Sequence, residues 1–276
     1  METLILAITG LSFLFWGSNK AEACQMQAQS YAIQQVQSDI YTPQEQSLGT
    51  VIIMPPTGGA NFLDRRYASS LCRAGFQSII ITGWEGMDEE SLDLSVHQRL
   101  LQRGQKAINE VVSTLNETPF IGILGTSVGA LHGMTALGST DKIAAGFFIA
   151  GGVPISQVIA ESTQKELAAY RKKRKKKFGF KDTREYTEAL SQVINPELEP
   201  MTYQESLLKK PMGFVLAQDD DTVSTELQQK VVEGFNPQTV FEIDAGHMWA
   251  IIKAWWFYEE AVVDFFVESA QNKSSS

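Results

Sequence analysis

Short apolar runs alternate with longer stretches of helical periodicity along most of the chain. The runs are rich in β-branched and aromatic residues, and most end at a proline, a glycine or a polar residue. We expect strands at 51–54, 78–82, 120–124, 145–149, 213–217 and 240–243. Continuous apolar strands separated by helices are typical of a parallel sheet covered on both faces. The pattern therefore predicts an α/β fold with a mostly parallel sheet.

Helices are expected between these strands. Apolar residues at helical spacing predict helices over 62–74, which stops at Gly75, over 92–115 and over 128–137. Residues 31–40 alternate between apolar and polar positions and are compatible with an added antiparallel edge strand.

One connection is much longer than a crossover requires. More than sixty residues separate Ile149 from Gly213, whereas a simple crossover needs about a dozen. Asp182-Thr-Arg-Glu185 and Thr202-Tyr-Gln-Glu205 both have the outline of a capping box. We expect a helical insertion, about 153–209, that covers a site as a lid. Its apolar residues suit apolar acyl groups or core packing: Val153, Ile155, Val158 and Ile159.

The segment Gly125-Thr126-Ser127-Val128-Gly129 carries the pattern of a nucleophile turn. It is a G-x-S-x-G sequence with a predicted strand before it and a predicted helix after it. A serine on such a strained turn stands at the carboxyl edge of the sheet, and the flanking glycines leave room for tightly packed backbone. In this context the motif predicts Ser127 as a nucleophile.

A serine hydroxyl is a poor nucleophile without a base that accepts its proton. His97 and His132 lie within predicted helices, where a surface or packed histidine is the simpler interpretation. His247 instead follows Ala245-Gly246 in a loop just beyond the strand 240–243, where it can reach over the sheet. We therefore expect His247 to be the base.

The base needs a carboxylate that orients it. Asp219, Asp220 and Asp221 follow the strand 213–217, and only one of three adjacent side chains can face inward. Three aspartates in a row are also typical of a solvated turn. The order serine, aspartate, histidine along the chain nevertheless agrees with nucleophile, acid and base.

Over residues 48–268, by motif and element order, the chain resembles the α/β-hydrolases. That family commonly carries its acid in a D-x-x-V-P sequence. Asp220-Asp221-Thr222-Val223-Ser224 resembles it with serine for proline, which favours Asp220 over Asp221. His247 in Ala-Gly-His resembles the family's Gly-His loop.

The resemblance also implies an oxyanion hole. Met54-Pro55-Pro56-Thr57-Gly58-Gly59 occupies the place of the family's His-Gly-x-Gly loop, with Pro55-Pro56 in place of His-Gly. Because Pro56 has no N–H, we expect the backbone amides of Thr57 and Val128 to be the two donors.

The resemblance implies a serine hydrolase that cleaves an ester-type bond (a carboxylester, thioester or lactone) through an acyl-enzyme, with no cofactor. Two alternatives stay open. One is a non-catalytic, envelope-associated binding module that keeps the fold, and the other is peptidase or acyltransferase chemistry on the same triad.

Composition narrows the function classes. The 276 residues are 43% hydrophobic and carry a formal net charge of -9, which is ordinary for a globular protein and argues against broad nucleic-acid binding. The three histidines share no metal-ligand spacing, so we expect no metal. We expect a single domain over 24–272 and a polar tail over 273–276.

The N-terminus has the outline of an export signal. The apolar run Leu4–Trp16 is too short to span a bilayer comfortably, and Ala21-Glu22-Ala23 is a small-x-small site before Cys24. We therefore expect residues 1–23 to direct export to the periplasm, the envelope or the medium. An uncleaved anchor and an apolar tail on a cytoplasmic protein are the alternatives. Cys24 is a candidate for lipidation, and nothing in the sequence shows that it pairs with Cys72.

A run of seven basic residues, Arg171–Lys177, lies inside the predicted insertion. A solvated helix face is the simpler interpretation. The functional interpretation is a patch for an anionic lipid or polymer.

Overall fold

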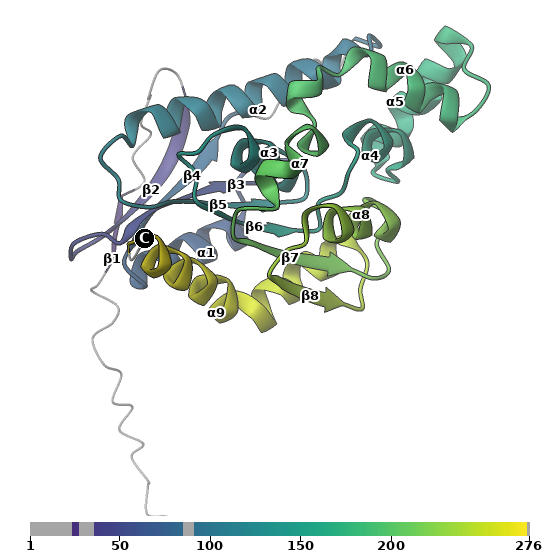
Figure 1. Cartoon of the computed structure of the whole chain (residues 1–276). Helices are drawn as coiled ribbons and strands as arrows, with labels where there is room; N and C mark the ends of the chain where they lie inside the picture. Colours follow the sequence, from purple (N-terminus) through teal and green to yellow (C-terminus); the bar gives the residue numbers. More distant parts are fainter. Residues whose placement is uncertain (1–23, 28–35, 85–90, 275–276) are drawn as a thin grey trace, which may run out of the picture.

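The protein is built around an eight-stranded sheet in the order β1-β2-β4-β3-β5-β6-β7-β8 (Figure 1). The computed structural model describes residues 24–27, 36–84 and 91–274. Strands β3 to β8 pair in parallel, and β1 and β2 add an antiparallel edge. The strands are β1 Cys24–Gln27, β2 Gln37–Pro43, β3 Gly49–Met54, β4 Phe76–Thr82, β5 Ile121–Thr126, β6 Ala145–Ile149, β7 Met212–Ala217 and β8 Thr239–Ile243.

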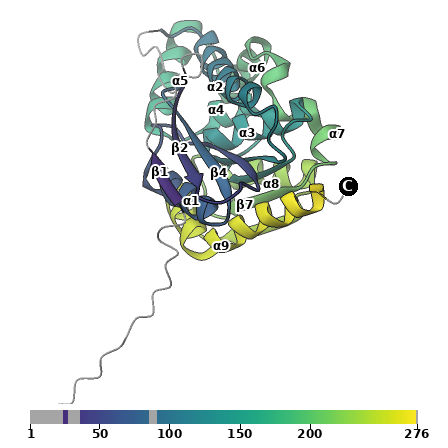
Figure 2. The ribbon, with the colours of Figure 1, turned by 90° about the vertical axis from the view of Figure 1, so that its left-hand side faces the viewer.

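Helices cover both faces of this sheet, and for this reason its central strands are buried throughout and mostly apolar (Figure 2). Helices α2, α3 and α8 pack on one face, and α1 and α9 pack on the other. Their bounds are α1 Phe62–Arg73, α2 Ser95–Thr114, α3 Val128–Ser139, α8 Thr225–Phe235 and α9 His247–Ser274.

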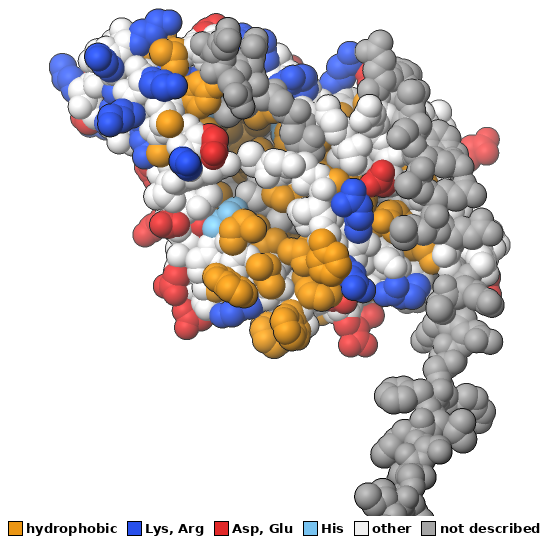
Figure 3. All heavy atoms as spheres, turned by 180° about the vertical axis from the view of Figure 1, so that it is seen from behind, with side chains coloured by type: hydrophobic (Ala, Val, Ile, Leu, Met, Phe, Trp, Pro, Cys, Tyr) orange, Lys and Arg blue, Asp and Glu red, His pale blue; other side chains and the backbone are white. Residues whose placement is uncertain are grey.

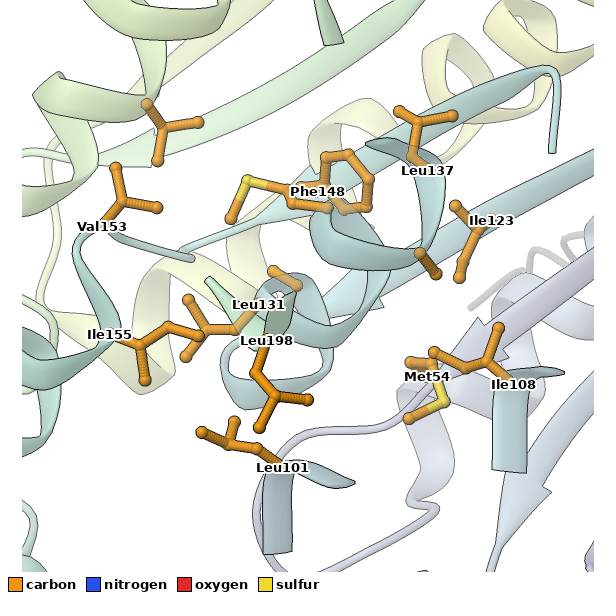
Figure 4. Packing of buried hydrophobic residues seen from close by; sticks show 14 of the residues in the cluster. Met54, Leu101, Ile108, Ile123, Leu131, Leu137, Phe148, Val153, Ile155 and Leu198 are labelled. Atoms are coloured by element: carbon orange, nitrogen blue, oxygen red, sulfur yellow. The ribbon is translucent and has the colours of Figure 1, made fainter. Parts of the chain in front are cut away.

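Side chains of one strand divide between two cores. Ile52 and Met54 of β3 belong to the cluster under α2 and α3, whereas Val51 and Ile53 belong to the cluster under α1 and α9. This is the two-residue period of a strand buried on both sides. Figure 4 shows the first cluster, in which Met54 meets Ile108 of α2.

The predicted α/β fold and its six strands are confirmed as β3 to β8, with ends that differ by one or two residues. The edge strand expected over 31–40 runs instead over Gln37–Pro43, and residues 31–35 lie outside the described residues. The first two residues of the polar tail expected over 273–276 instead continue α9, which ends at Ser274.

The long connection is a helical insertion. It contains α4 Ile155–Glu161, α5 Lys165–Phe178, α6 Thr183–Val193, the 3₁₀ helices η2 Pro196–Leu198 and η3 Pro200–Tyr203, and α7 Gln204–Leu207. Asp182 caps α6 as predicted, because its side chain accepts a hydrogen bond from the Glu185 amide at 2.9 Å. The capping box expected at Thr202 is wrong. Pro200 already starts η3 two residues earlier, and the Thr202 hydroxyl donates to the Pro196 carbonyl.

Cys24 of β1 forms a disulfide with Cys72 of α1, with 5.8 Å between the Cα atoms. The sulfur of Cys24 is therefore not free to carry a thioether lipid. The proposed export signal, residues 1–23, lies outside the described residues. Among the helices of the described ranges, none combines the length and the hydrophobicity needed to cross a membrane.

We predict that reduction of the Cys24–Cys72 disulfide lowers the free energy of unfolding by about 2–4 kcal/mol, because the bond closes a loop in the unfolded chain. Urea denaturation with and without dithiothreitol measures the difference. A C24S/C72S double variant is the control and should be indifferent to the reductant. Equal midpoints for the oxidised and reduced native chain would contradict the prediction.

Candidate active site

Ser127 sits at a sharp turn between β5 and α3. Its backbone has φ 56° and ψ −121°, a conformation that L-residues rarely adopt and that costs on the order of 1–3 kcal/mol. The flanking glycines make this turn sterically feasible. A Cβ on Gly129 would lie 2.1 Å from the Met54 carbonyl oxygen, and one on Gly125 would lie 2.4 Å from the Gly129 oxygen. The backbone is therefore packed too tightly for any other residue type at these two positions.

His247, the first residue of α9, faces Ser127 across the end of the sheet. Its Nε2 lies 2.9 Å from the Ser127 Oγ, and its Nδ1 lies 2.6 Å from Asp220 Oδ2. An ionised carboxylate only accepts hydrogen bonds, so Nδ1 carries the proton and Nε2 is left to accept from the serine hydroxyl. The three predicted side chains thus form one continuous chain of hydrogen bonds.

The structure distinguishes among the three adjacent aspartates. Asp220 is buried, and its Oδ1 accepts from the amides of Thr222 and Val223 at 2.8 and 3.0 Å. Asp221 is exposed. Asp219 is exposed as well, and its pKa is raised because its carboxyl shares a hydrogen bond with that of Asp244. Only Asp220 faces the histidine.

Sequence reasoning missed Gln228, a fully buried residue of α8. Its amide nitrogen donates to Asp220 Oδ2 at 2.8 Å and to the Val223 carbonyl, and its oxygen accepts from the Ala217 amide. Gln228 therefore holds both the carboxylate and the end of β7. The available sequence signal was a glutamine on the helix face that is otherwise formed by Leu227, Val231 and Phe235, since a buried polar side chain needs partners.

The proposed oxyanion donors lie beside the nucleophile. Thr57 and Gly58 are the centre of a turn in which the Gly59 amide donates to the Pro56 carbonyl at 3.1 Å, and Gly58 has φ +97°. Thr57 and Val128 line the same cavity as Ser127. Val128 opens α3, so its amide is one of those that have no acceptor within the helix.

An apolar cavity of about 640 Å³ extends from Ser127 towards the insertion. Trp84, Leu100, Leu101, Leu131 and Leu167 line it together with Ile155, Val158 and Ile159. For the last three the sequence left open a place at the site or in the core, and the structure gives them both, because they also belong to the core cluster. Val153, the fourth such residue, packs in the core between sheet and helices instead (Figure 4).

Solved structures of the same architecture include several esterases. Esterase Pf2001 from Pyrococcus furiosus superposes with a TM-score of 0.54 at 19% identity, over 85% of this chain and 88% of that one. Est1E from Butyrivibrio proteoclasticus gives 0.59 at 16%, over 85% and 95%. A bacterial brefeldin A esterase gives 0.63 at 12%, over 99% and 81%. The chain has the α/β-hydrolase fold. No protein-family model matches it, and neither does any curated protein sequence.

The other two histidines of this α/β-hydrolase fold are packed residues, as the simpler interpretation expected. Burial lowers the pKa of His97 to about 3, with the Arg174 charge as a second cause, and burial alone lowers the pKa of His132 to about 3. His132 packs edge-to-face on Trp84, with 4.7 Å between ring centroids. Both rings are therefore neutral at physiological pH.

The basic run lies on α5 and is only partly solvated. Arg174 is fully buried, so the run is neither a wholly solvated helix face nor a patch of all seven charges. Its guanidinium donates to the carbonyls of Leu92 and Asp93, to His97 Nε2 and to the Tyr186 hydroxyl. Arg171 donates to the carbonyls of Ala160 and Ser162. Both arginines fasten the insertion, because a guanidinium satisfies several acceptors at once.

We predict that Arg174→Ala destabilises the protein by about 3 kcal/mol, since it leaves several buried acceptors without a donor. The neighbouring Lys173→Ala is the matched control. Lys173 is exposed, so its removal should leave stability unchanged. Thermal and urea denaturation compare the two variants, and equal stability would contradict this role of Arg174.

Proposed function

We propose that the protein is a serine hydrolase that cleaves esters with an apolar acyl group. The observation that carries this proposal is the hydrogen-bonded chain Ser127–His247–Asp220 at one end of an apolar cavity. Acyl transfer requires a nucleophile, a base of defined tautomer and a carboxylate that orients the base, and the three residues fit these roles in this order: Ser127, His247 and Asp220.

In the proposed reaction the Ser127 Oγ attacks the ester carbonyl while His247 Nε2 takes the hydroxyl proton. Asp220 holds the ring and stabilises the imidazolium. The amides of Thr57 and Val128 stabilise the oxyanion. The C–O bond to the alcohol then breaks, and His247 returns the proton to the departing oxygen. Water, activated by His247, cleaves the acyl-enzyme and restores Ser127.

The similar solved structures support an ester as the substrate class, because Pf2001 and the brefeldin A enzyme are esterases by name. The cavity supports an apolar acyl group. Its wall is mainly aliphatic and aromatic, and its volume lies within the range usual for small-molecule sites. A carboxylester, a thioester and a lactone share the carbonyl chemistry that the triad serves.

We predict that Ser127→Ala abolishes hydrolysis of a p-nitrophenyl ester and labelling by a fluorophosphonate probe, with little loss of thermal stability. Asp220→Asn should lower kcat by about 10⁴, because the wrong histidine tautomer is then favoured. Asp221→Asn is the matched control: it changes an exposed neighbour and should retain normal turnover.

The competing functions predict different outcomes of the labelling and turnover measurements. A folded wild-type chain that no fluorophosphonate labels would be a non-catalytic binding module. Labelling of Ser127 with turnover only on amides, or only with an acceptor alcohol, would indicate a peptidase or an acyltransferase. Turnover retained in Ser127→Ala would overturn the triad.

The cavity wall generates a prediction on acyl length. Val158→Trp places an indole in the space beyond Ser127 and should lower kcat/KM for an octanoyl ester at least tenfold more than for an acetyl ester. Val153→Ala is the control, because Val153 packs in the core and does not line the cavity. It should lower stability without changing chain-length preference. An unchanged preference in Val158→Trp would contradict the proposed acyl site.

We further propose that the enzyme works outside the cytoplasm. The Cys24–Cys72 disulfide supports this location, since such bonds persist in oxidising compartments. The exposed lysines of the basic run support an anionic partner there: Lys172, Lys173, Lys176 and Lys177.

A further inference from the structure

Large apolar side chains gather on the surface where α9 begins. Met248, Trp249, Trp256 and Phe257 of α9 and Phe62 of α1 are each more than half exposed. Figure 3 shows apolar side chains collected on one face of the molecule, with a histidine at their edge. We call these five residues the aromatic patch.

The first three turns of α9 carry apolar side chains on most of their circumference, and Lys253, whose Nζ donates to the Asp244 carbonyl, is their one charged residue. Ala250, Ile251 and Ala254 face the core, and the aromatic patch occupies the opposite side of the same turns. Beyond Tyr258 the outer side of α9 becomes acidic and polar in the usual way. Large apolar side chains on the outer side of a surface helix depart from the polar outer face that is usual in water, and this departure indicates a partner with apolar surface.

Three rings of the patch, Phe62, Trp256 and Phe257, contact neighbouring side chains. Phe62 follows the capping residue Asn61 and packs edge-to-face on Trp255, with 5.9 Å between ring centroids. The guanidinium of Arg66 covers its ring at 4.8 Å. Trp256 and Phe257 lie beside one another, with ring centroids 6.4 Å apart. The exposed rings therefore need little ordering before they meet a partner.

We propose that the aromatic patch inserts into the surface of a phospholipid bilayer. Trp and Phe side chains on the outer side of a surface helix favour the boundary between headgroups and acyl chains. Charge complementarity supports a bilayer with anionic lipids, because the exposed lysines of α5 stand at one end of the face that carries the patch (Figure 3).

A second apolar segment precedes Cys24 in the sequence. The disulfide fixes Cys24 to Cys72, which is ten residues along α1 from Phe62, about 15 Å of helix. The apolar run Leu4–Trp16 precedes Cys24 by only seven intervening residues. A bilayer that receives this run is within reach of the patch, and one lipid surface would engage both.

His247 connects the patch to the candidate active site. It is the residue directly before Met248, and its ring reaches Ser127. Docking through the patch would bring the candidate active site to the lipid surface, where esters with apolar acyl chains concentrate. The docking itself does not depend on the proposed hydrolysis.

The test measures quenching of tryptophan fluorescence by brominated acyl chains. Vesicles contain phosphatidylcholine and phosphatidylglycerol in equal amounts, and the full chain carries Trp16→Phe to remove the tryptophan of the N-terminal run. We expect strong quenching from Trp249 and Trp256, and loss of that part of the quenching in Trp249→Phe/Trp256→Phe, which retains only Trp84 and the partly buried Trp255. Trp84, which is buried, should stay unquenched.

Vesicle sedimentation gives a second measurement. Trp249→Ser/Trp256→Ser should lower partitioning at least tenfold, whereas Phe178→Ser, which removes an exposed aromatic residue of α5, should not. Binding by Ser127→Ala should equal that of the wild type, so failure of the proposed hydrolysis and failure of docking are distinguishable.

Three results would overturn the proposal. Absence of quenching in sedimented protein would mean that other residues bind the lipid. If the wild type is a dimer and the Trp249→Ser/Trp256→Ser variant is a monomer, the patch is an interface between two copies of the chain. The emission of Trp249 and Trp256 could also be blue-shifted without lipid and unchanged by vesicles. That result would mean that another segment of this chain covers the patch.

Discussion

The candidate active site depends on one close approach of backbone to backbone. Gly129, in the first turn of α3, lies against the Met54 and Pro55 carbonyls at the end of β3, where a Cβ would fall 2.1 Å from an oxygen. This contact brings the strained turn of Ser127 and the loop of Thr57 to the same edge of the sheet. Because protein interiors are close-packed, a single added methyl group would separate the nucleophile from the proposed oxyanion donors.

The parallel sheet supplies the rest of the site. Strands β5, β7 and β8 run in the same direction, so the segments that follow them meet at one edge and bring Ser127, Asp220 and His247 together. Gln228 adds a hydrogen bond that keeps the carboxylate turned inward. The His247 ring is therefore held between Ser127 and Asp220, which lie far apart in the sequence.

The insertion joins the site to the outer surface. Buried Arg174 ties α5 to the start of α2 through carbonyl groups, and Ile155, Val158 and Ile159 of α4 form one wall of the cavity. A run of basic residues thus has two uses, since the arginines fasten the helix and the lysines face solvent. The aromatic patch begins at Met248, directly after His247, so the proposed catalytic base and the proposed lipid surface share one helix.

The sequence by itself determined the α/β fold, its six parallel strands, the candidate residues Ser127 and His247, and a candidate acid within Asp219–Asp221, of which the resemblance favoured Asp220. These follow from local rules: strand patterns, the G-x-S-x-G turn and the order of motifs along the chain. Only the tertiary structure decided that Asp220 and not Asp221 meets the histidine, that Gln228 supports it, that Arg174 is buried and that Cys24 pairs with Cys72. Except for the contact of Gln228 with Asp220, which spans eight residues, these depend on contacts between segments distant in the chain, and local sequence carries no information on how such segments pack.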